Sequence, residues 1–348
     1  MSCSRRERPC RVGRGVPAAL LAMLCALASA PAAGASPGGA ARAVASPGGP
    51  AKAVACTRSP GDVTLPVTYG GRSYDVLAHL PPAPRAGRLP LVLNLHGSQS
   101  RGSRQLGYSG MRATADREGF VVAVPDGAIP AGDGFSWNVP GVTTGPRDDV
   151  GFLGQVIDTL GTRLCADPAR VYVTGYSGGG RMASALACRI PERIAAIAPV
   201  AGLRAGTPDP ADDTRPATAS CRPPRPVPVA AFHGEQDHTN PYGGGGSPAW
   251  RYSVPAAQRR WAELNGCSLA PRTEPLTPHV RRVTYGGCRG GADVVLHDIT
   301  DGGHTWPGSP EESAGNGHTN REISANTSMW AFFQRHTRHT PRTPHTAH

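Results

Sequence analysis

The chain has 348 residues and a formal net charge of +11. Most of that charge lies at the two ends, because the first 55 residues and the last three arginines together carry +9. The middle of the chain is left with +2, and this nearly neutral charge does not argue for nucleic-acid binding. With roughly 280 residues, this middle region is long enough for one large domain.

The first 35 residues have the features of an export signal. Five arginines precede an apolar stretch at 18–30, which is too short to anchor stably in a membrane. Residues 36–55 contain a tandem decamer without large apolar side chains, which predicts a flexible linker. Residues 336–348 are predicted to be a disordered polar tail. The sequence therefore predicts a secreted protein with one folded domain over 56–335.

Six cysteines follow the signal, and an even number in an exported chain favours disulfide bonds. None of them forms a C-x-x-C motif, so a zinc site is not expected, and no G-x-G-x-x-G fingerprint indicates a dinucleotide. The favoured pairing is Cys188 with Cys221 and Cys267 with Cys288 as local links, which leaves Cys56 with Cys165.

The domain alternates between apolar strand-like runs and amphipathic helix-like runs. The expected strands, in chain order, are a hairpin at 63–69 and 72–78, then 89–95, 120–124, 170–174, 194–200, 227–232, 280–285 and 292–299. The expected helices are 104–118, 149–164, 255–265 and 322–336, with one more after residue 180. Strands that alternate with helices predict an α/β fold, a mostly parallel doubly wound sheet with helices on both faces.

The stretch Gly175-Tyr176-Ser177-Gly178-Gly179 is the most informative motif. An apolar, β-branched run precedes it and a helix-like run follows it, which is the context of a nucleophile elbow. In such an elbow the serine occupies a strained turn at the top of a sheet, and the flanking glycines avoid clashes. Ser177 is the predicted nucleophile. Ser109, in a partial copy of the motif without a preceding strand, is predicted to lie in an ordinary loop.

A serine hydroxyl needs a base within hydrogen-bond reach and a carboxylate that orients the base. In doubly wound hydrolases the acid and then the base follow the serine, on loops after later strands. Asp237 fits the acid because it closely follows the strand at 227–232, with Glu235 as its local competitor. His304 fits the base because it lies in a glycine-flanked loop after the strand at 292–299. The rival histidines are His233, His238, His279, His297 and His318.

Attack on an ester builds negative charge on the carbonyl oxygen, and two backbone N–H groups typically stabilise it. One is expected from Gly178, directly after the nucleophile. The other is expected from Ser98, because the segment His96-Gly97-Ser98 ends the strand at 89–95. His96 is predicted to shape this loop and not to act as a base.

Together these motifs resemble the secreted esterase family that contains polyhydroxybutyrate depolymerases and feruloyl or acetylxylan esterases. The matching segments are 93–97, 171–180, 233–242 and 303–307. The resemblance extends from about residue 60 to residue 335. It implies an α/β-hydrolase that needs no cofactor or metal and cleaves carboxylic esters through an acyl-enzyme.

Carried over to this sequence, the resemblance makes Ser177 the nucleophile, His304 the base and Asp237 the acid that orients it. It also assigns Trp306 and Tyr176 to substrate binding, with core packing as the alternative for Trp306. Many relatives have a cysteine where this chain has the serine after His96-Gly97, a change that leaves the backbone N–H in place.

The leading hypothesis is a secreted, monomeric serine esterase that acts on hydroxyalkanoate polyesters or oligoesters. The runner-up is a feruloyl or acetylxylan esterase that acts on plant cell-wall esters. An envelope acyltransferase and an inactive hydrolase-like binding protein are alternatives of another class. The ester substrate is the one partner expected, without nucleic acid and without a stable membrane anchor.

Overall fold

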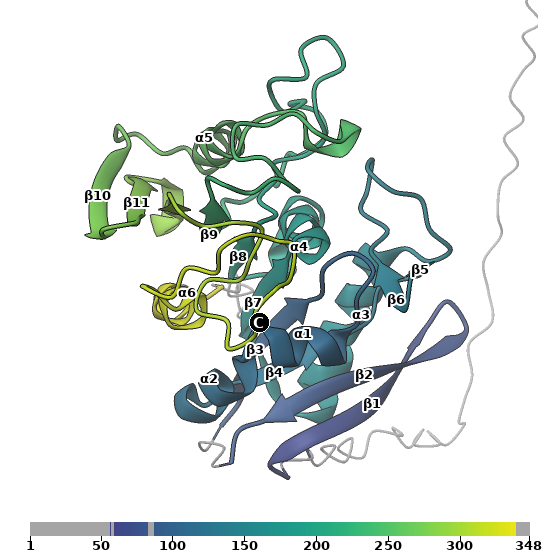
Figure 1. Cartoon of the computed structure of the whole chain (residues 1–348). Helices are drawn as coiled ribbons and strands as arrows, with labels where there is room; N and C mark the ends of the chain where they lie inside the picture. Colours follow the sequence, from purple (N-terminus) through teal and green to yellow (C-terminus); the bar gives the residue numbers. More distant parts are fainter. Residues whose placement is uncertain (1–55, 57–58, 83–86, 339–348) are drawn as a thin grey trace, which may run out of the picture. The chain divides into compact units, whose positions relative to one another are not determined.

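The fold is built on a ten-stranded sheet, described by a computed structural model for residues 56, 59–82 and 87–338 (Figure 1). Its strands are β1 (Gly61–Tyr69), β2 (Arg72–Leu80), β3 (Leu89–Leu95), β4 (Val121–Val124), β7 (Ala166–Tyr176), β8 (Ala196–Val200), β9 (Val229–Gly234), β10 (Arg272–Thr277), β11 (Val280–Tyr285) and β12 (Val294–Ile299). A separate hairpin pairs β5 (Ile129–Ala131) with β6 (Gly134–Ser136). The helices are α1 (Gly102–Tyr108), α2 (Met111–Glu118), α3 (Asp149–Arg163), α4 (Gly178–Arg189), α5 (Val254–Asn265) and α6 (Ala325–Phe333).

The strand order in the sheet is β1-β2-β4-β3-β7-β8-β9-β12-β11-β10. The middle strands, from β4 to β12 in this order, run parallel. Antiparallel strands complete the two edges, the β1–β2 hairpin on one side and β11 with β10 on the other. The predicted α/β-hydrolase architecture, a mostly parallel doubly wound sheet, is confirmed.

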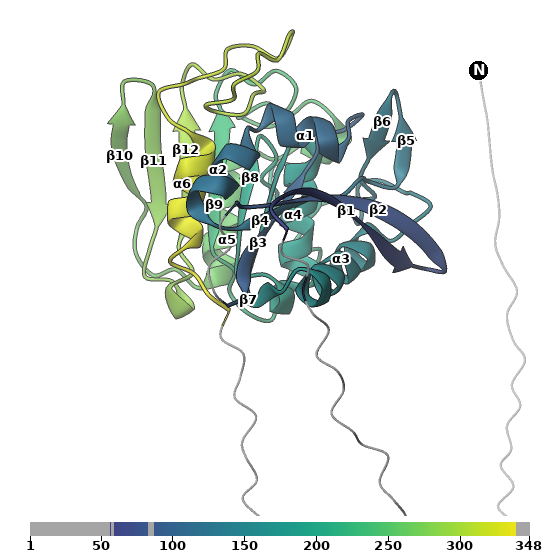
Figure 2. The same cartoon turned by 90° about the horizontal axis from the view of Figure 1, so that it is seen from below.

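Two separate cores lie against the two faces of the sheet. Successive residues of a strand point to opposite faces, so on β3 Leu91 and Leu93 belong to one core and Val92 to the other. Helices α3, α4 and α5 contribute to the first core, and α1, α2 and α6 to the second. Figures 1 and 2 show these two groups of helices on opposite faces. Cover on both faces explains the apolar runs of the central strands, of which β4 and β8 are apolar throughout.

The predicted elements are confirmed to within four residues at each end, with three exceptions. The helix expected at 104–118 is two helices, α1 and α2, because Gly110 between them has a left-handed φ of 63° that a continuous helix cannot contain. The hairpin β5–β6 was not predicted, and neither was β10, whose residues are mostly exposed and lack an apolar pattern.

The predicted disulfide pairing is confirmed. The pairs are Cys56–Cys165, Cys188–Cys221 and Cys267–Cys288. The predicted signal at 1–35 and linker at 36–55 lie outside the described residues, as does most of the predicted tail at 336–348. Within the described part of the chain, no helix has the length and apolar character needed to cross a membrane.

Candidate active site

Ser177 lies at the sharp turn where β7 ends and α4 begins. Its φ of 52° and ψ of −111° are strained for a residue with a side chain, which is typical of functional turns. The turn is crowded, because a Cβ on Gly175 would lie 2.6 Å from the backbone of Gly179, and one on Gly179 would lie 2.1 Å from the carbonyl oxygen of Leu95. The glycines of the motif are therefore required by the packing of the turn.

The predicted acid and base meet at the carboxyl ends of two neighbouring strands. Asp237 follows β9 and His304 follows β12, and these strands are paired in parallel. Nδ1 of His304 lies 2.7 Å from Oδ2 of Asp237. Both side chains are almost fully buried, with 4% of His304 and 2% of Asp237 exposed. Glu235, the competing acid, instead forms an ion pair with Arg281 on β11, which lies two strands away from β9 in the sheet.

The Asp237 carboxylate is held by several donors. Its Oδ1 accepts the backbone N–H groups of Thr239 at 2.9 Å and Asn240 at 2.7 Å. Burial by itself raises the pKa of Asp237, but hydrogen bonds from His233 and His304 outweigh burial and lower the pKa well below its usual value of 3.8. The carboxylate is therefore ionised at neutral pH.

His233, which the sequence offered only as a rival base, also contacts the carboxylate of Asp237. Its Nε2 is 2.8 Å from the carbonyl oxygen of Asn240 and 3.3 Å from Oδ2 of Asp237. A carbonyl oxygen can only accept, so Nε2 carries a proton and donates. The spacing of four residues between His233 and Asp237, just after a strand, was the signal available in the sequence.

Tyr176 connects the serine turn to the base. Its hydroxyl donates to the carbonyl oxygen of His304 at 2.5 Å, and the two rings are 5.0 Å apart. Burial raises the pKa of Tyr176 above its usual value, so the hydroxyl stays protonated. Among the described residues the Ser177 hydroxyl has no hydrogen-bond partner, so the contact between Ser177 and His304 is not formed in this arrangement. Such contacts are often long without substrate.

The two predicted N–H donors for the oxyanion lie side by side. A Cβ on Gly178 would be 3.1 Å from the backbone nitrogen of Ser98 and 2.5 Å from its Oγ. The first turn of α4 therefore packs directly against the segment that follows β3. This brings the backbone of Ser98 next to the residue that follows Ser177.

His96 fixes the shape of this segment. Its Nε2 accepts the N–H of Gly127 at 2.9 Å, so the proton resides on Nδ1 and is donated to the carbonyl oxygen of Gly97 at 2.7 Å. The indole N–H of Trp137 donates to the His96 carbonyl oxygen at 2.8 Å. Burial lowers the pKa of His96, which keeps the ring neutral in this role. These contacts support the predicted structural role.

A cavity of about 280 Å³ lies beside Ser98 and Tyr176. The ring of Tyr108 forms a further part of its wall, 5.2 Å from the ring of Tyr176. The charged residues that line the cavity are Arg104, Glu311 and Glu312. Because Ser98, one of the two N–H donors, and Tyr176, which directly precedes Ser177, both line this cavity, it is the candidate substrate pocket.

Trp306 does not line this cavity. None of its surface is exposed, and its indole N–H donates to Asn326 at 3.0 Å. Its backbone N–H donates to the hydroxyl of Tyr108, also at 3.0 Å. This placement favours the core-packing alternative for Trp306, which then affects the pocket only through Tyr108.

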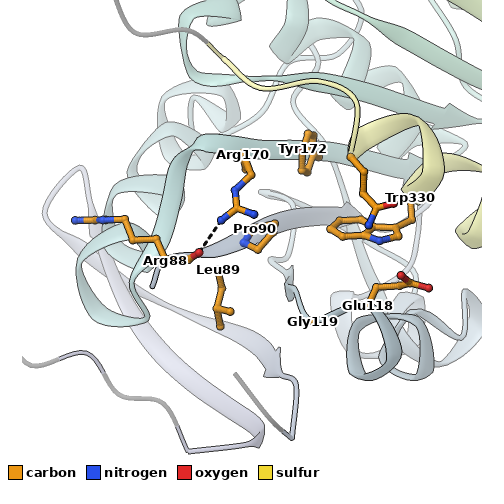
Figure 3. A pocket seen from close by; sticks show the side chains of 9 residues that line it. Arg88, Leu89, Pro90, Glu118, Gly119, Arg170, Tyr172 and Trp330 are labelled. Carbon is orange, nitrogen blue, oxygen red and sulfur yellow. Dashed lines mark hydrogen bonds between the residues drawn. The ribbon is translucent and has the colours of Figure 1, made fainter. Parts of the chain in front are cut away.

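A cavity of about 330 Å³ lies away from the carboxyl ends of the strands, beside the amino end of β3 and residues Arg170 and Tyr172 of β7 (Figure 3). There Arg170 donates to the carbonyl oxygen of Arg88, and the ring of Trp330 forms one wall. The described residues that line this cavity include no serine, cysteine or histidine, so they offer no pair of nucleophile and base. Across the described residues, no group of three His, Cys, Asp or Glu side chains is arranged to hold a metal ion.

Comparison with known proteins adds to this geometry. Residues 73–237, which include Ser98, Ser177 and Asp237, match the family model described as Esterase PHB depolymerase. A Nocardia uniformis protein named "Putative esterase NocK" is 31% identical over 287 residues, which cover 76% of this chain and 80% of that protein. The chain belongs to the Esterase PHB depolymerase family.

This member of the Esterase PHB depolymerase family is also 34% identical over 223 residues to feruloyl esterase B of Piromyces equi. That match covers 62% of this chain but only 39% of the relative, so the chain spans well under half of that protein. Among solved structures, the acetyl xylan esterase from Aspergillus awamori aligns with a TM-score of 0.51 and 18% identity, over 74% of this chain and 94% of that one. This likeness supports the fold.

Proposed function

We propose that this protein is a serine hydrolase that cleaves carboxylic esters through an acyl-enzyme on Ser177. The observation that carries the proposal is the 2.7 Å bond between His304 and Asp237. It is formed at the carboxyl ends of the parallel strands, where the strained Ser177 turn also lies. An ionised acid, a buried base and a serine in an elbow are the three parts that nucleophilic ester cleavage needs.

The geometry suggests a role for each group. Nδ1 of His304 donates to Asp237, so Nε2 is free to take the proton of Ser177 as the hydroxyl attacks the ester carbonyl. The N–H groups of Gly178 and Ser98 then stabilise the oxyanion of the tetrahedral intermediate. His304 returns the proton to the departing alcohol, and water activated by the same imidazole releases the acid.

Short hydroxyalkanoate esters are the substrates we propose first. The family model supports a hydroxybutyrate-type acyl group, and a cavity of about 280 Å³ accepts one short acyl unit more readily than a polymer chain. A feruloyl ester is the second candidate. It is favoured by the identity to feruloyl esterase B and by the two tyrosine rings of the cavity, Tyr108 and Tyr176, against which an aromatic acyl group can pack.

We also propose that the protein acts outside the cell and as a monomer. Its three disulfides fit an oxidising compartment, and the sequence of residues 1–35 has the pattern of an export signal.

The test is acid release by the purified protein from hydroxybutyrate oligoesters and from methyl ferulate, offered in parallel. Ser177→Ala should lose at least a thousandfold in kcat on whichever substrate the wild type hydrolyses. Ser103→Ala is the matched control, because Ser103 is an exposed residue of α1. Comparable rates for Ser177→Ala and Ser103→Ala would refute the site. Release from one substrate alone identifies the acyl class, and transfer to an added alcohol in place of hydrolysis would indicate an acyltransferase.

A further inference from the structure

Two arginines beside α4 lack a counter-ion. Arg204 is only 5% exposed, yet its Nη2 has no hydrogen-bond acceptor. Arg181, in the first turn of α4, has a buried Nε that also lacks an acceptor. Neither arginine forms an ion pair with any residue in the described part of the chain. Buried charges are normally paired, so the buried Arg204 is unusual, and the half-buried Arg181 adds a second unpaired cation.

The contacts of Arg204 leave one edge of its guanidinium unsatisfied. Nε donates to the carbonyl oxygen of Leu203 at 2.6 Å, and Nη1 donates to that of Tyr252 at 2.7 Å. The rings of Trp250 and Tyr252 lie 3.5 and 4.0 Å from the guanidinium carbon. Cation–π contacts of this kind stabilise the charge, but they provide no acceptor for the N–H groups of Nη2.

Electrostatics at this position favour a bound negative charge. Burial lowers the pKa of Arg204 to about 10, and the positive charge of Arg181 acts in the same direction. Arg204 therefore still carries its charge at neutral pH, next to a second cation. An anion between the two would relieve their repulsion and accept the unpaired N–H groups.

Both arginines line the same small cavity. The space open to the centre of a water molecule is about 30 Å³, which suits one monatomic ion or one water and excludes a bulky ligand. Val139, Val142 and a third arginine, Arg189, also contribute to its wall, and none of the described residues that line it is acidic. A small cavity lined by arginines and apolar side chains has the chemistry of a halide site.

We propose that this cavity binds one small monovalent anion of halide size, held between Arg181 and Arg204. The ion accepts N–H groups from both guanidinium groups and links α4 to the chain that follows β8. Arg204 also stacks on Trp250, whose ring lies 5.6 Å from that of His233. The ion thus stabilises the stack of Arg204, Trp250 and His233, and His233 contacts Asp237. This site is independent of the proposed ester hydrolysis.

The test compares melting temperatures in sodium chloride, sodium bromide and sodium gluconate at equal ionic strength, because gluconate is too large for the cavity. Wild type should melt higher in both halides, with a saturable rise of about 5 °C at a hundredfold excess over the dissociation constant. Arg181→Met and Arg204→Met should each lose this rise. Arg163→Met, which alters an exposed arginine of α3, should keep it.

Crystals soaked in bromide provide the direct measurement, with anomalous density expected between Arg181 and Arg204. Equal melting of the wild type in chloride and gluconate, without bromide density in the cavity, would overturn the proposal and leave water as the occupant. A halide effect that persists in Arg181→Met would place the ion elsewhere. If Arg204→Met does not fold, Arg181→Met still decides, because the Arg181 side chain has no hydrogen-bond or ion-pair partner among the described residues to lose.

Discussion

Replacing His233 by phenylalanine should destabilise the protein and slow its reaction, because this imidazole holds both the acid and the loop that carries it. Its Nε2 lies 2.8 Å from the carbonyl oxygen of Asn240 and 3.3 Å from Oδ2 of Asp237. Phenylalanine keeps an aromatic ring against Trp250 but removes the donor. The substitution thus separates hydrogen bonding from packing.

The two contacts set the expected size of the effect. Because one N–H on Nε2 is shared between the Asn240 carbonyl oxygen and the Asp237 carboxylate, the two contacts together contribute about 2 kcal/mol, the value of one bond to a charged group. The free energy of unfolding should fall by about 2 kcal/mol, which lowers the melting temperature by roughly 3–4 °C for a domain of about 280 residues. As Asp237 loses a donor that orients it, kcat should fall by roughly tenfold to a hundredfold.

Thermal unfolding and initial rates of ester cleavage measure these effects. The matched control is His297→Phe, because His297 is also buried but its bond to the carbonyl oxygen of Ala231 is long, at 3.4 Å. A double-mutant cycle of His233→Phe with Asp237→Asn should give a coupling energy of about 1.5 kcal/mol. If His233→Phe behaves like His297→Phe, or the cycle is additive to within about 0.5 kcal/mol, the reasoning is refuted.

Three further outcomes follow from the same contacts. Gly178→Ala places a carbon 2.5 Å from Oγ and 3.1 Å from the backbone nitrogen of Ser98. Because this displaces the oxyanion donors, kcat should fall about a hundredfold. An unchanged kcat would place oxyanion binding elsewhere. The pKa of Asp237 is lower in the folded state than its usual 3.8, so its contribution to stability is present above pH 3.8 and lost as the pH falls below it. The difference in unfolding free energy between wild type and Asp237→Asn should shrink from pH 6 to pH 2, and a constant difference would contradict the assignment. Replacing Cys188 and Cys221 by serine removes a disulfide between positions 33 residues apart. The free energy of unfolding, measured with denaturant, should fall by about 3–4 kcal/mol. An unchanged denaturation midpoint would show that this disulfide adds no stability.

Most of the sheet could be predicted because its central strands are covered on both faces and therefore contain continuous apolar runs. β3 is the clearest case, since all its residues are buried. β10 escaped prediction because it is an edge strand, where charged residues such as Arg272 and Glu274 pair with each other and leave no apolar pattern. The break between α1 and α2 depends on the φ of Gly110, which the sequence does not contain.

The candidate site was predictable where chain order carries information. The order of serine, acid and base indicated Asp237 and His304, and the structure brings these two within hydrogen-bond distance. The four-residue spacing of His233 and Asp237 was the available signal, but spacing alone does not indicate which carboxylate a histidine faces, so their contact was not predicted. The burial of Trp306 was also hidden, because its partner Asn326 lies 20 residues further along the chain.

The pairing of β9 with β12 continues into the loops that carry the acid and the base. Beyond the strand ends, the N–H of Gln236 still donates to the carbonyl oxygen of Gly302 at 2.9 Å. Asp237 and His304 are each within two residues of this bond, so their separation is set before either loop leaves the sheet. Evolution can therefore lengthen or rewrite the outer parts of both loops, and with them the choice of ester, while the acid–base distance is inherited unchanged. Protein engineers could exploit the same property by transplanting the two loops together as one unit.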